Sequence, residues 1–142
     1  MALHYGGRPI LVDPVQERLD FAKALGVVCV VNPVREELVE RVAAYTGGRF
    51  AECVMEASGS GKAIRDCLDV VCHAGRVAFT GWPKGETSLP TDIFTRKELD
   101  VRGARNSAGE FAEAIELIAS GKVDVPIWNQ CVVPCPVLTV AS

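Results

Sequence analysis

The sequence of 142 residues lacks the features that mark several common functional classes. Lys and Arg number 15 against 18 Asp and Glu, for a net charge of −3, so a nucleic-acid backbone is not an expected partner. No apolar run approaches the ~20 residues that a membrane helix needs. Residues 1–8 are too few and too polar for a signal peptide. We therefore expect a cytoplasmic protein that binds neither nucleic acid nor membrane.

Familiar catalytic and metal-binding motifs are also missing. The sequence has no G-x-G-x-x-G loop, no H-E-x-x-H and no C-x-x-C, and it has no nucleophile elbow with Ser-His-Asp partners. The only two histidines are His4, near the start, and His73. We place His73 at a helix C-terminus, where a cation is favourable and a structural role fits. We therefore assign no catalytic residue and no metal ligand.

Six cysteines need an interpretation. We expect the first four to be small buried hydrophobes, as free cysteine often is, and we expect no disulfide framework without a secretory signal. The last two, Cys131 and Cys135, lie in an unusual proline-containing tail. A structural zinc site takes four ligands, so this pair alone does not make one, and its role stays open. The first four are Cys29, Cys53, Cys67 and Cys72.

What the sequence does contain is a regular alternation of apolar runs and amphipathic stretches. This alternation, with short connections, predicts an α/β domain with a mostly parallel sheet and helices on both faces. In the last helix the spacing of Phe111, Ala114 and Ile118 predicts that they face inward. The predicted strands are 10–12, 27–31, 51–57, 76–80, 99–104 and a short edge strand at 87–89; the predicted helices are 16–25, 36–45, 62–73 and 110–120.

Ligands of such sheets bind at the carboxyl ends of the strands. There, Asp13 has two interpretations: an N-cap ahead of Pro14, or an acid that binds the vicinal hydroxyls of a ribose and favours NAD over NADP. Arg18, about one turn further on, either reaches that nucleotide or is a solvated surface arginine. Residues 58–61, Ser-Gly-Ser-Gly, fit either a phosphate cradle or a tight turn. The rule selects Asp13, Asn32, 57–59, Thr80, Gly81 and 104–107.

Several of these runs, in order, resemble the cofactor domain of the zinc-dependent medium-chain alcohol and polyol dehydrogenases. The resemblance covers residues 1 to about 125 with the family's spacing. Arg-Asn-Ser at 105–107 resembles the branch that oxidises sugars and sugar acids more than the simple alcohol branch. The matching segments are Ile10-Leu11-Val12-Asp13 with the helix to Gly26, Val30 to Pro33, Val54 to Gly59, Gly75 to Gly81, and Leu99 to Ser107.

The resemblance implies a Rossmann-like fold, an NAD(P)-linked oxidoreductase, and roles for particular residues. Asp13 then matches the acid that holds the adenosine ribose, and Arg18 the basic residue that contacts the same ribose. The segment Thr87–Leu89 matches an edge strand that pairs across a homodimer. The remaining matches are Ala57 and Ser58 on the adenosine side of the cleft, and Thr80, Gly81, Ala104 and Asn106 around the nicotinamide.

The chain departs from the family at both ends. The first strand and glycine-rich loop are not matched, nor are the zinc ligands, so we expect residues 1–125 to form a truncated doubly wound sheet and 126–142 an atypical tail. The first strand is central in that fold, and we expect direct closure of the sheet or a poorly packed seam. NAD binding should then be weaker than millimolar, with no turnover. The alternative is a standalone nucleotide-binding or protein-interaction module without catalysis.

Overall fold

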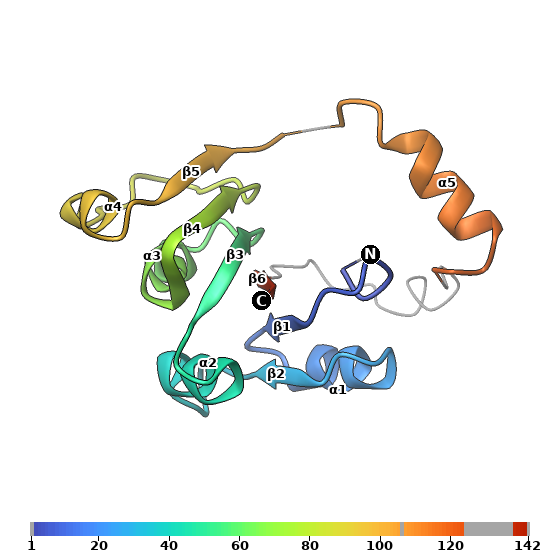
Figure 1. The fold of residues 1–142 in the computed structure, drawn as a ribbon, viewed down its shortest axis with the longest axis horizontal. Coiled ribbons are helices and arrows are strands. Elements are labelled where there is room, and N and C mark those ends of the chain that lie inside the picture. The colour runs from blue at the N-terminus through green and yellow to red at the C-terminus, as the bar shows by residue number, and fades with distance from the viewer. Residues whose placement is uncertain (1, 106, 124–137, 142) are drawn as a thin grey trace.

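A six-stranded sheet with helices on both faces organises the molecule (Figure 1). The computed structural model describes residues 2–105, 107–123 and 138–141. The predicted alternation of strands and helices is confirmed. In chain order the elements are β1 (Pro9–Val12), α1 (Gln16–Ala24), β2 (Cys29–Val31), α2 (Leu38–Thr46), β3 (Ala51–Glu56), α3 (Gly61–Val70), β4 (Val71–Phe79), α4 (Asp92–Arg96), β5 (Asp100–Gly103), α5 (Phe111–Ala119) and β6 (Leu138–Ala141).

The strand order is β2-β1-β6-β3-β4-β5. β1 pairs parallel with β2, and β3, β4 and β5 pair parallel with one another. β6 lies between the two groups and runs antiparallel to both neighbours, with Val140 opposite Ile10 on one side and Val54 on the other. This order is that of a doubly wound sheet, in which the position of the first strand is here held by β6.

The predicted direct closure of the sheet is therefore wrong. Two inner strands that face an empty slot each present a row of backbone N–H and C=O groups, and orphaned groups of this kind are costly when buried. A strand of four residues pairs with both rows along its whole length. Pro134 and Pro136, which have no N–H to donate to a ladder, precede its first residue, Leu138.

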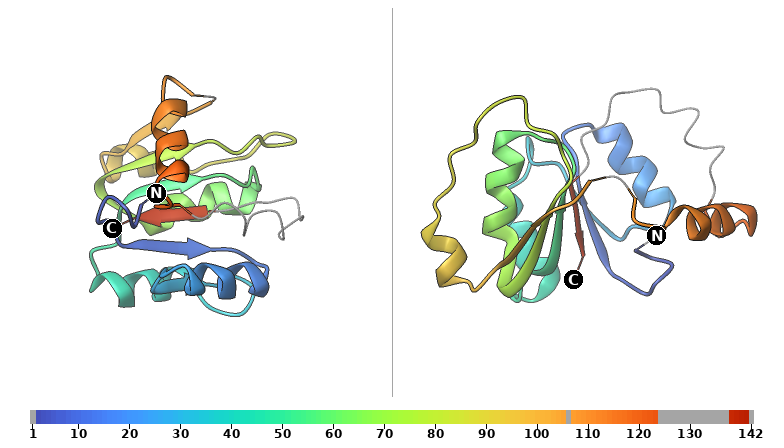
Figure 2. Two further views of the ribbon diagram at one scale, coloured as in Figure 1. Left: turned by 90° about the vertical axis from the view of Figure 1, so that its right-hand side faces the viewer. Right: turned by 90° about the horizontal axis from the view of Figure 1, so that it is seen from above.

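The two faces of the sheet are covered unequally. α2 and α3 lie on one face and α1 on the other (Figure 2). The larger core lies under α2 and α3, where Val12 and Val54 of the sheet meet Val42 and Leu68 of the helices. The smaller core joins α1 to the opposite face of β1 and β2, through Leu19, Ala22 and Val30. β1 and β2 are thus sandwiched, as the fully apolar run at 27–31 predicts.

The third helix ends earlier than predicted. α3 stops at Val70, and β4 begins at the next residue. Val70 and Val71 are both completely buried, and Val71 pairs with Ala51 of β3, so the chain passes from helix to strand inside the core. His73 therefore lies exposed on β4 rather than at a helix C-terminus, and its predicted position is wrong.

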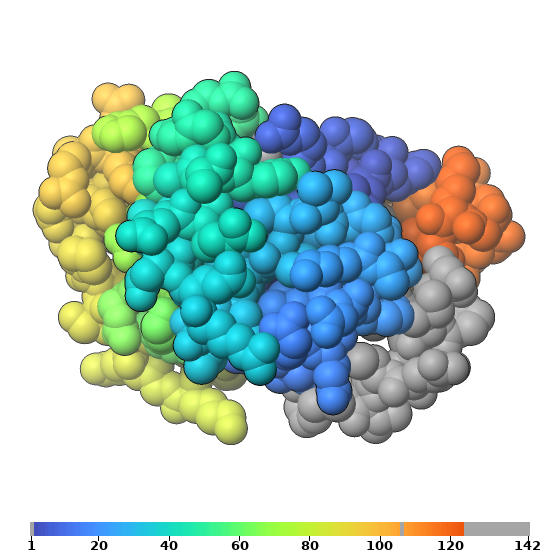
Figure 3. Space-filling model, turned by 90° about the horizontal axis from the view of Figure 1, so that it is seen from below, coloured from blue at the N-terminus to red at the C-terminus, as the bar shows by residue number. Residues whose placement is uncertain are grey.

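The last helix and the short edge strand also differ from expectation. Within α5 only Leu117 is buried, while Phe111 and Ile118 are 71% and 46% exposed. Their predicted inward orientation is wrong because α5 lies at the edge of the molecule beside the N-terminal residues (Figure 3), where the hydroxyl of Tyr5 donates to Glu113. Residues 87–89 form no strand with any other described residue.

Candidate functional site

The carboxyl ends of the parallel strands lie along one edge of the sheet, with β6 between the two groups of strands. The N–H of Asp13, just after β1, donates to the last carbonyl of β2 at 3.2 Å. In the other half of the sheet, Thr80 N–H donates to the carbonyl of Glu56 at 2.8 Å and Ala104 N–H donates to Phe79 at 2.9 Å. These bonds extend the ladders by one residue, so the predicted ligand-binding positions are held by the sheet itself.

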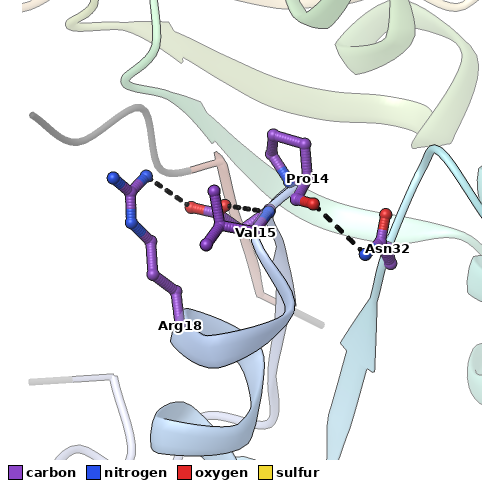
Figure 4. A network of polar contacts seen from close by, with 5 residues as sticks. Pro14, Val15, Arg18 and Asn32 are labelled. Carbon is purple, nitrogen blue, oxygen red and sulfur yellow. Dashed lines mark hydrogen bonds and ion pairs between the residues drawn. The ribbon is translucent and has the colours of Figure 1, made fainter. Parts of the chain in front are cut away.

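Asp13 and Arg18 form a buried ion pair at this edge. Asp13 is completely buried and Arg18 is only 9% exposed, and Arg18 Nη1 lies 3.3 Å from Asp13 Oδ2. The other carboxylate oxygen of Asp13 accepts a 2.7 Å hydrogen bond from the N–H of Val15. Figure 4 shows Arg18 reaching back from α1 to make this contact.

Of the interpretations given for these two residues, the helix N-cap and the solvated arginine are wrong. α1 begins at Gln16 with Val15 at the N-cap position and no side-chain capping bond. The Asp13 carboxylate instead orders the turn into the helix from two residues earlier, and it keeps Arg18 folded against the sheet. The pair therefore places a buried carboxylate and a nearly buried guanidinium where β1 ends.

Asn32 ties the end of β2 to the same turn. Its side-chain amide donates to the carbonyl of Pro14 at 3.2 Å and to Gln16 Oε1 at 3.4 Å, while its Oδ1 accepts from the N–H of Val34 at 3.1 Å. The bond to Pro14 is visible in Figure 4. With all these bonds Asn32 is buried, and its role here is to fix the spacing of the two loops.

Glu56 is the residue of this edge that sequence reasoning missed. It is completely buried at the end of β3, where its Oε1 accepts from Ser58 N at 2.7 Å, Ser58 Oγ at 2.5 Å and Gly59 N at 2.9 Å. Its carbonyl accepts from Thr80 and Gly81 of the next loop. One glutamate thus holds both loops. The sequence does contain a signal that could have identified Glu56. This acid ends an apolar run, and Ser58-Gly59 follows it after one residue.

Two glycines let these loops pack backbone against backbone. A Cβ on Gly81 would lie 2.2 Å from the nitrogen of Gly59, and a Cβ on Gly59 would lie 2.4 Å from the carbonyl oxygen of Trp82. Gly59 also has φ +68°, which disfavours any side chain. Of the two interpretations of residues 58–61, the tight turn describes their backbone, and the first amides of this turn bind Glu56.

Thr80, Gly81 and Ala104 come together in a surface hollow of about 280 Å³ at the ends of β4 and β5. Thr80 Oγ1 donates to the carbonyl of Glu56 at 3.0 Å. The predicted positions therefore fall into two groups: Asp13 and Arg18 beside β2, and the hollow with the adjoining half-buried Ala57 and Ser58. β6 separates the two groups. Asn106 lies outside the described residues.

Metal-ligating groups do not gather in the part of the chain that the structure describes. Over residues 2–105, 107–123 and 138–141 there is no cluster of three His, Cys, Asp or Glu side chains that could hold a metal. Cys29 and Cys67 are buried, as expected, whereas Cys53 and Cys72 are partly exposed; all four are free thiols. Burial, followed by the charge of Glu56, raises the pKa of the Cys67 thiol. Cys131 and Cys135 lie outside the described residues.

None of the described helices is long and apolar enough to cross a membrane.

A dinucleotide would place two requirements on this edge of the sheet. An adenosine ribose needs a carboxylate acceptor beside β1, and Asp13 supplies one. A pyrophosphate needs backbone amides at a helix N-terminus after the central strand. β6 runs the opposite way, so Leu138, its first residue, lies at this edge opposite Val12 and Glu56. Among the described residues no helix starts from the central strand there. A carboxylate lies at the ribose position, although it is completely buried, and the pyrophosphate position lacks its amides within the described residues.

Comparison with known proteins gives a family. Residues 1–120 match the family model described as zinc-binding dehydrogenase. An uncharacterised zinc-type alcohol dehydrogenase-like protein of Haemophilus influenzae is 47% identical over 132 residues, which cover 92% of this chain and 39% of that protein. The 2-dehydro-3-deoxy-L-galactonate 5-dehydrogenase of Pseudoalteromonas atlantica is 35% identical, covering 94% and 39%. The chain thus spans about two fifths of the length of these relatives.

Solved structures give the same fold. An oxidoreductase/dehydrogenase of unknown specificity from Escherichia coli, described as involved in membrane biogenesis, superposes with a TM-score of 0.78 at 25% identity, over 83% of this chain and 34% of that one. A zinc-binding dehydrogenase from Sinorhizobium meliloti bound to NADP gives 0.76 at 21% identity, over 83% and 36%, which supports the fold alone. Both likenesses agree with the Rossmann-like sheet described above.

Proposed function

Because this chain belongs to the family of zinc-binding dehydrogenases, we propose that it forms the nucleotide-binding part of an NAD(P)-linked oxidoreductase that acts on an alcohol, polyol or sugar acid. Its relatives include, besides the galactonate enzyme above, a sorbitol dehydrogenase of Bacillus subtilis that is 28% identical over 122 residues. In such an enzyme the nicotinamide accepts or gives up the hydride, and the protein binds and orients it.

The observation that carries this proposal is the Asp13–Arg18 pair. A carboxylate that is completely buried, at the end of β1, and held by a backbone amide and a guanidinium, is oriented before any ligand arrives. Because Asp13 is completely buried, a ribose could reach it only after a local opening of this edge. Asp13 would then accept hydrogen bonds from the ribose hydroxyls and disfavour a 2′-phosphate by charge repulsion, so NAD is the preferred form. Arg18 would hold that carboxylate in place and lend a donor to the ribose oxygens.

The affinity of the chain itself is expected to be low. The amides that a pyrophosphate needs are not offered by β6, and Gly59, in the neighbouring turn, already donates to Glu56. We therefore propose a dissociation constant for NAD above about 1 mM, that is, less than roughly 4 kcal/mol of binding. We also propose that the chain alone does not oxidise alcohols or polyols.

The test is an NMR titration of the ¹⁵N-labelled chain with NAD and, separately, with NADP. We expect small, fast-exchange shifts around 13–18 that do not saturate below millimolar NAD, and smaller ones with NADP. D13N should remove the difference between the two nucleotides, whereas K62Q, in the exposed pair Lys62–Asp66, should leave it unchanged. Micromolar affinity would contradict the weak-binding proposal, and shifts confined to other regions would contradict the ribose site.

Turnover is tested directly by following NADH formation at 340 nm with the chain, zinc and a set of polyols and sugar acids. We expect a rate no higher than that of a sample without protein. A protein-dependent rate that disappears in D13A would show that the chain is an active enzyme by itself.

We also propose that residues 87–89 pair with a second copy of the chain. Thr87 and Leu89 are half-buried and alternate with exposed Ser88 and Pro90, which is the period-two pattern of an extended strand. An extended segment becomes a β-strand only when its backbone is hydrogen-bonded to a neighbouring strand, and the same segment of a second copy would supply that neighbour.

A protein-interaction module without catalysis is the second candidate, because Phe111, Ile115 and Ile118 line one exposed side of α5. Light scattering after size exclusion distinguishes pairing through residues 87–89 from association through α5. If the pairing is at 87–89, S88P gives a monomer and I115E remains a dimer, because proline disrupts strand pairing. The opposite result would favour α5 as the interaction surface, and a monomeric native chain would contradict the homodimer.

A further inference from the structure

The central strand β6 runs in the opposite direction to both of its neighbours. It pairs antiparallel with β1 and β3, whereas the other pairings of the described sheet are parallel. Its four residues face all of β1 but only the last four of the six residues of β3. Because the N–H and C=O groups of an inner strand can pair in either direction, the slot between β1 and β3 could also hold a strand that is parallel to both.

Residues 2–7 have the backbone geometry with which α-helices end. The N–H of Gly7 donates to the carbonyl of Ala2 at 2.9 Å, and the N–H of Gly6 donates to the carbonyl of Leu3 at 3.1 Å. Gly6 is left-handed, with φ +76°. This pair of bonds around a left-handed glycine is the Schellman motif of helix C-termini. Since β1 begins at Pro9, a helix that ended on this motif would lead directly into β1.

The turn formed by residues 2–7 lies beside the end of α1. Leu3 Cδ1 is 3.8 Å from the position that a Cβ on Gly26 would take, two residues after the end of α1 at Ala24. Strand–helix–strand connections are right-handed, so a helix between a strand in the central slot and β1 lies on the same face as α1, which connects β1 to β2. A helix that ended at Gly6 would therefore run alongside α1 and begin at the carboxyl edge of the sheet.

The sheet has an open surface where such a helix would lie. Val54 of β3 packs in the core under α2 and α3, and successive strand residues point to opposite faces, so Cys53 and Met55 face the side of α1. Met55 is 44% exposed and Cys53 is half-buried, because the core of α1 on this face reaches only Leu11 and Val30 of β1 and β2. Parallel sheets are normally covered on both faces, and a helix next to α1 would complete that cover.

We propose that β6 is a displaceable strand, and that the slot between β1 and β3 receives a strand–loop–helix segment of a partner polypeptide. Its strand is parallel to β1 and β3, its loop is glycine-rich, and its helix covers Met55 and ends at the turn of residues 2–7. While β6 holds the slot it inhibits nucleotide binding, because the amides that bind a pyrophosphate follow the carboxyl end of a parallel central strand. Only this last step rests on the proposed function.

The test uses the full chain and a labelled synthetic peptide of about 30 residues, enough for a strand, a loop and a helix. Its sequence is the one that directly precedes the matched region of the Haemophilus influenzae relative. We expect saturable one-to-one binding by fluorescence anisotropy. Hydrogen exchange of the complex should show loss of protection in the amides of β6, while those of β1 and β3 stay protected by the new strand.

Variants of the chain show whether β6 competes with the peptide. T139P is expected to bind the peptide at least about tenfold tighter, because proline weakens β6 as a rival strand. T139G, which keeps the N–H, is the milder variant in case T139P does not fold, and it should bind about threefold tighter. V77A is the matched control: Val77 is buried in β4, which pairs with β3 and β5 and not with β6, so peptide affinity should not change.

Three outcomes overturn the exchange of strands. These are no binding to the native chain or the Thr139 variants, binding that leaves β6 protected, and equal binding of a peptide with two prolines in its strand.

Nucleotide binding is measured separately. The complex should bind NAD at least about tenfold tighter than the chain alone, because the loop adds pyrophosphate contacts, and a peptide whose loop glycines are replaced by alanine should displace β6 without this gain. Displacement of β6 by the original peptide with no gain would overturn its inhibitory role. Failure of the ribose site would show in the NMR titration without peptide, so the two failures are distinguishable.

Discussion

At the scale of single residues, the site depends on two buried acids that have different hydrogen-bonding partners. Asp13 and Glu56 are both completely buried at strand ends, yet Asp13 binds a guanidinium and one backbone amide, while Glu56 binds two backbone amides and a hydroxyl. A buried charge is tolerated only when it is paired or hydrogen-bonded in this way. Removing one group of such a contact therefore leaves the other group in a low-dielectric environment with fewer compensating bonds.

For the ion pair, D13A is expected to destabilise the chain by about 3 kcal/mol, because it removes the buried carboxylate that binds both the N–H of Val15 and the nearly buried guanidinium of Arg18. Urea unfolding followed by circular dichroism measures this. The control is R96A, which breaks the Arg96–Asp92 pair, whose partners are 65% and 67% exposed, and should cost less than about 1 kcal/mol. Equal effects of the two variants would mean that burial of Asp13 does not determine its contribution.

For the paired loops, G81A is expected to destabilise by roughly 2 kcal/mol or more, because its Cβ would meet backbone atoms that cannot move without breaking the Glu56 bonds. The control is G85A, where no atom lies within 4 Å of the added Cβ and φ is not in the left-handed range. We expect G85A to be within about 0.5 kcal/mol of the native chain. A tolerated G81A would contradict the close packing of the two loops.

The sequence predicted Asp13 better than Glu56 for a physical reason. An acid directly after an apolar run and before a helix lies at a strand end, where ligands bind, and position alone selects it. An acid that completes the run is ordinarily expected on an exposed face, since Glu is rarely buried. What buries Glu56 is the turn that follows it, and the closeness of that turn to residues 80–82 is set by tertiary packing.

At the scale of elements, the periodicity of the sequence predicted the type of each long element but not where it packs. The spacing in 62–73 continues through Val71, yet the helix ends at Val70 because the next residues pair with β3. α5 has a clear apolar side, but that side is exposed. Local pattern specifies helix or strand; the partner depends on residues far away in the sequence.

β6 is the element on which the sheet depends most. As an inner strand it has a neighbour on both sides, so each of its N–H groups faces a strand. T139P is expected to destabilise by about 3 kcal/mol or more, because proline removes a donor from the middle of a sheet. A chain that ends at residue 137 should lose at least as much, whereas one that ends at residue 141 should unfold like the native chain.

Hydrogen exchange provides the second measurement for β6. In T139P, the amides of β1 and β3 should lose protection while those of β5, which pairs only with β4, should keep most of theirs. Unchanged protection in β1 and β3 would contradict the strand order at the centre of the sheet.

At the scale of the whole molecule, the fold and family follow from ordered patterns, whereas zinc does not follow from family membership. A structural zinc site takes four ligands, and no group of even three candidate side chains gathers within the described residues. We expect the purified, dialysed chain to hold well below one zinc per molecule by mass spectrometry, and EDTA to leave its thermal midpoint unchanged. One zinc per chain that is lost in a C131A/C135A variant would place a site in the tail.

The position of β6 also has a consequence for how the chain is made. Ile10 pairs with Val140, 130 positions later, so the centre of the sheet closes only after almost everything else has been synthesised. At about 5–20 residues per second, the inner edge of β1 waits on the order of 10 s for its central partner. Until β6 is available, β1–β2 and β3–β5 can pair only as two separate half-sheets, each with an open inner edge of the kind to which other strands can add.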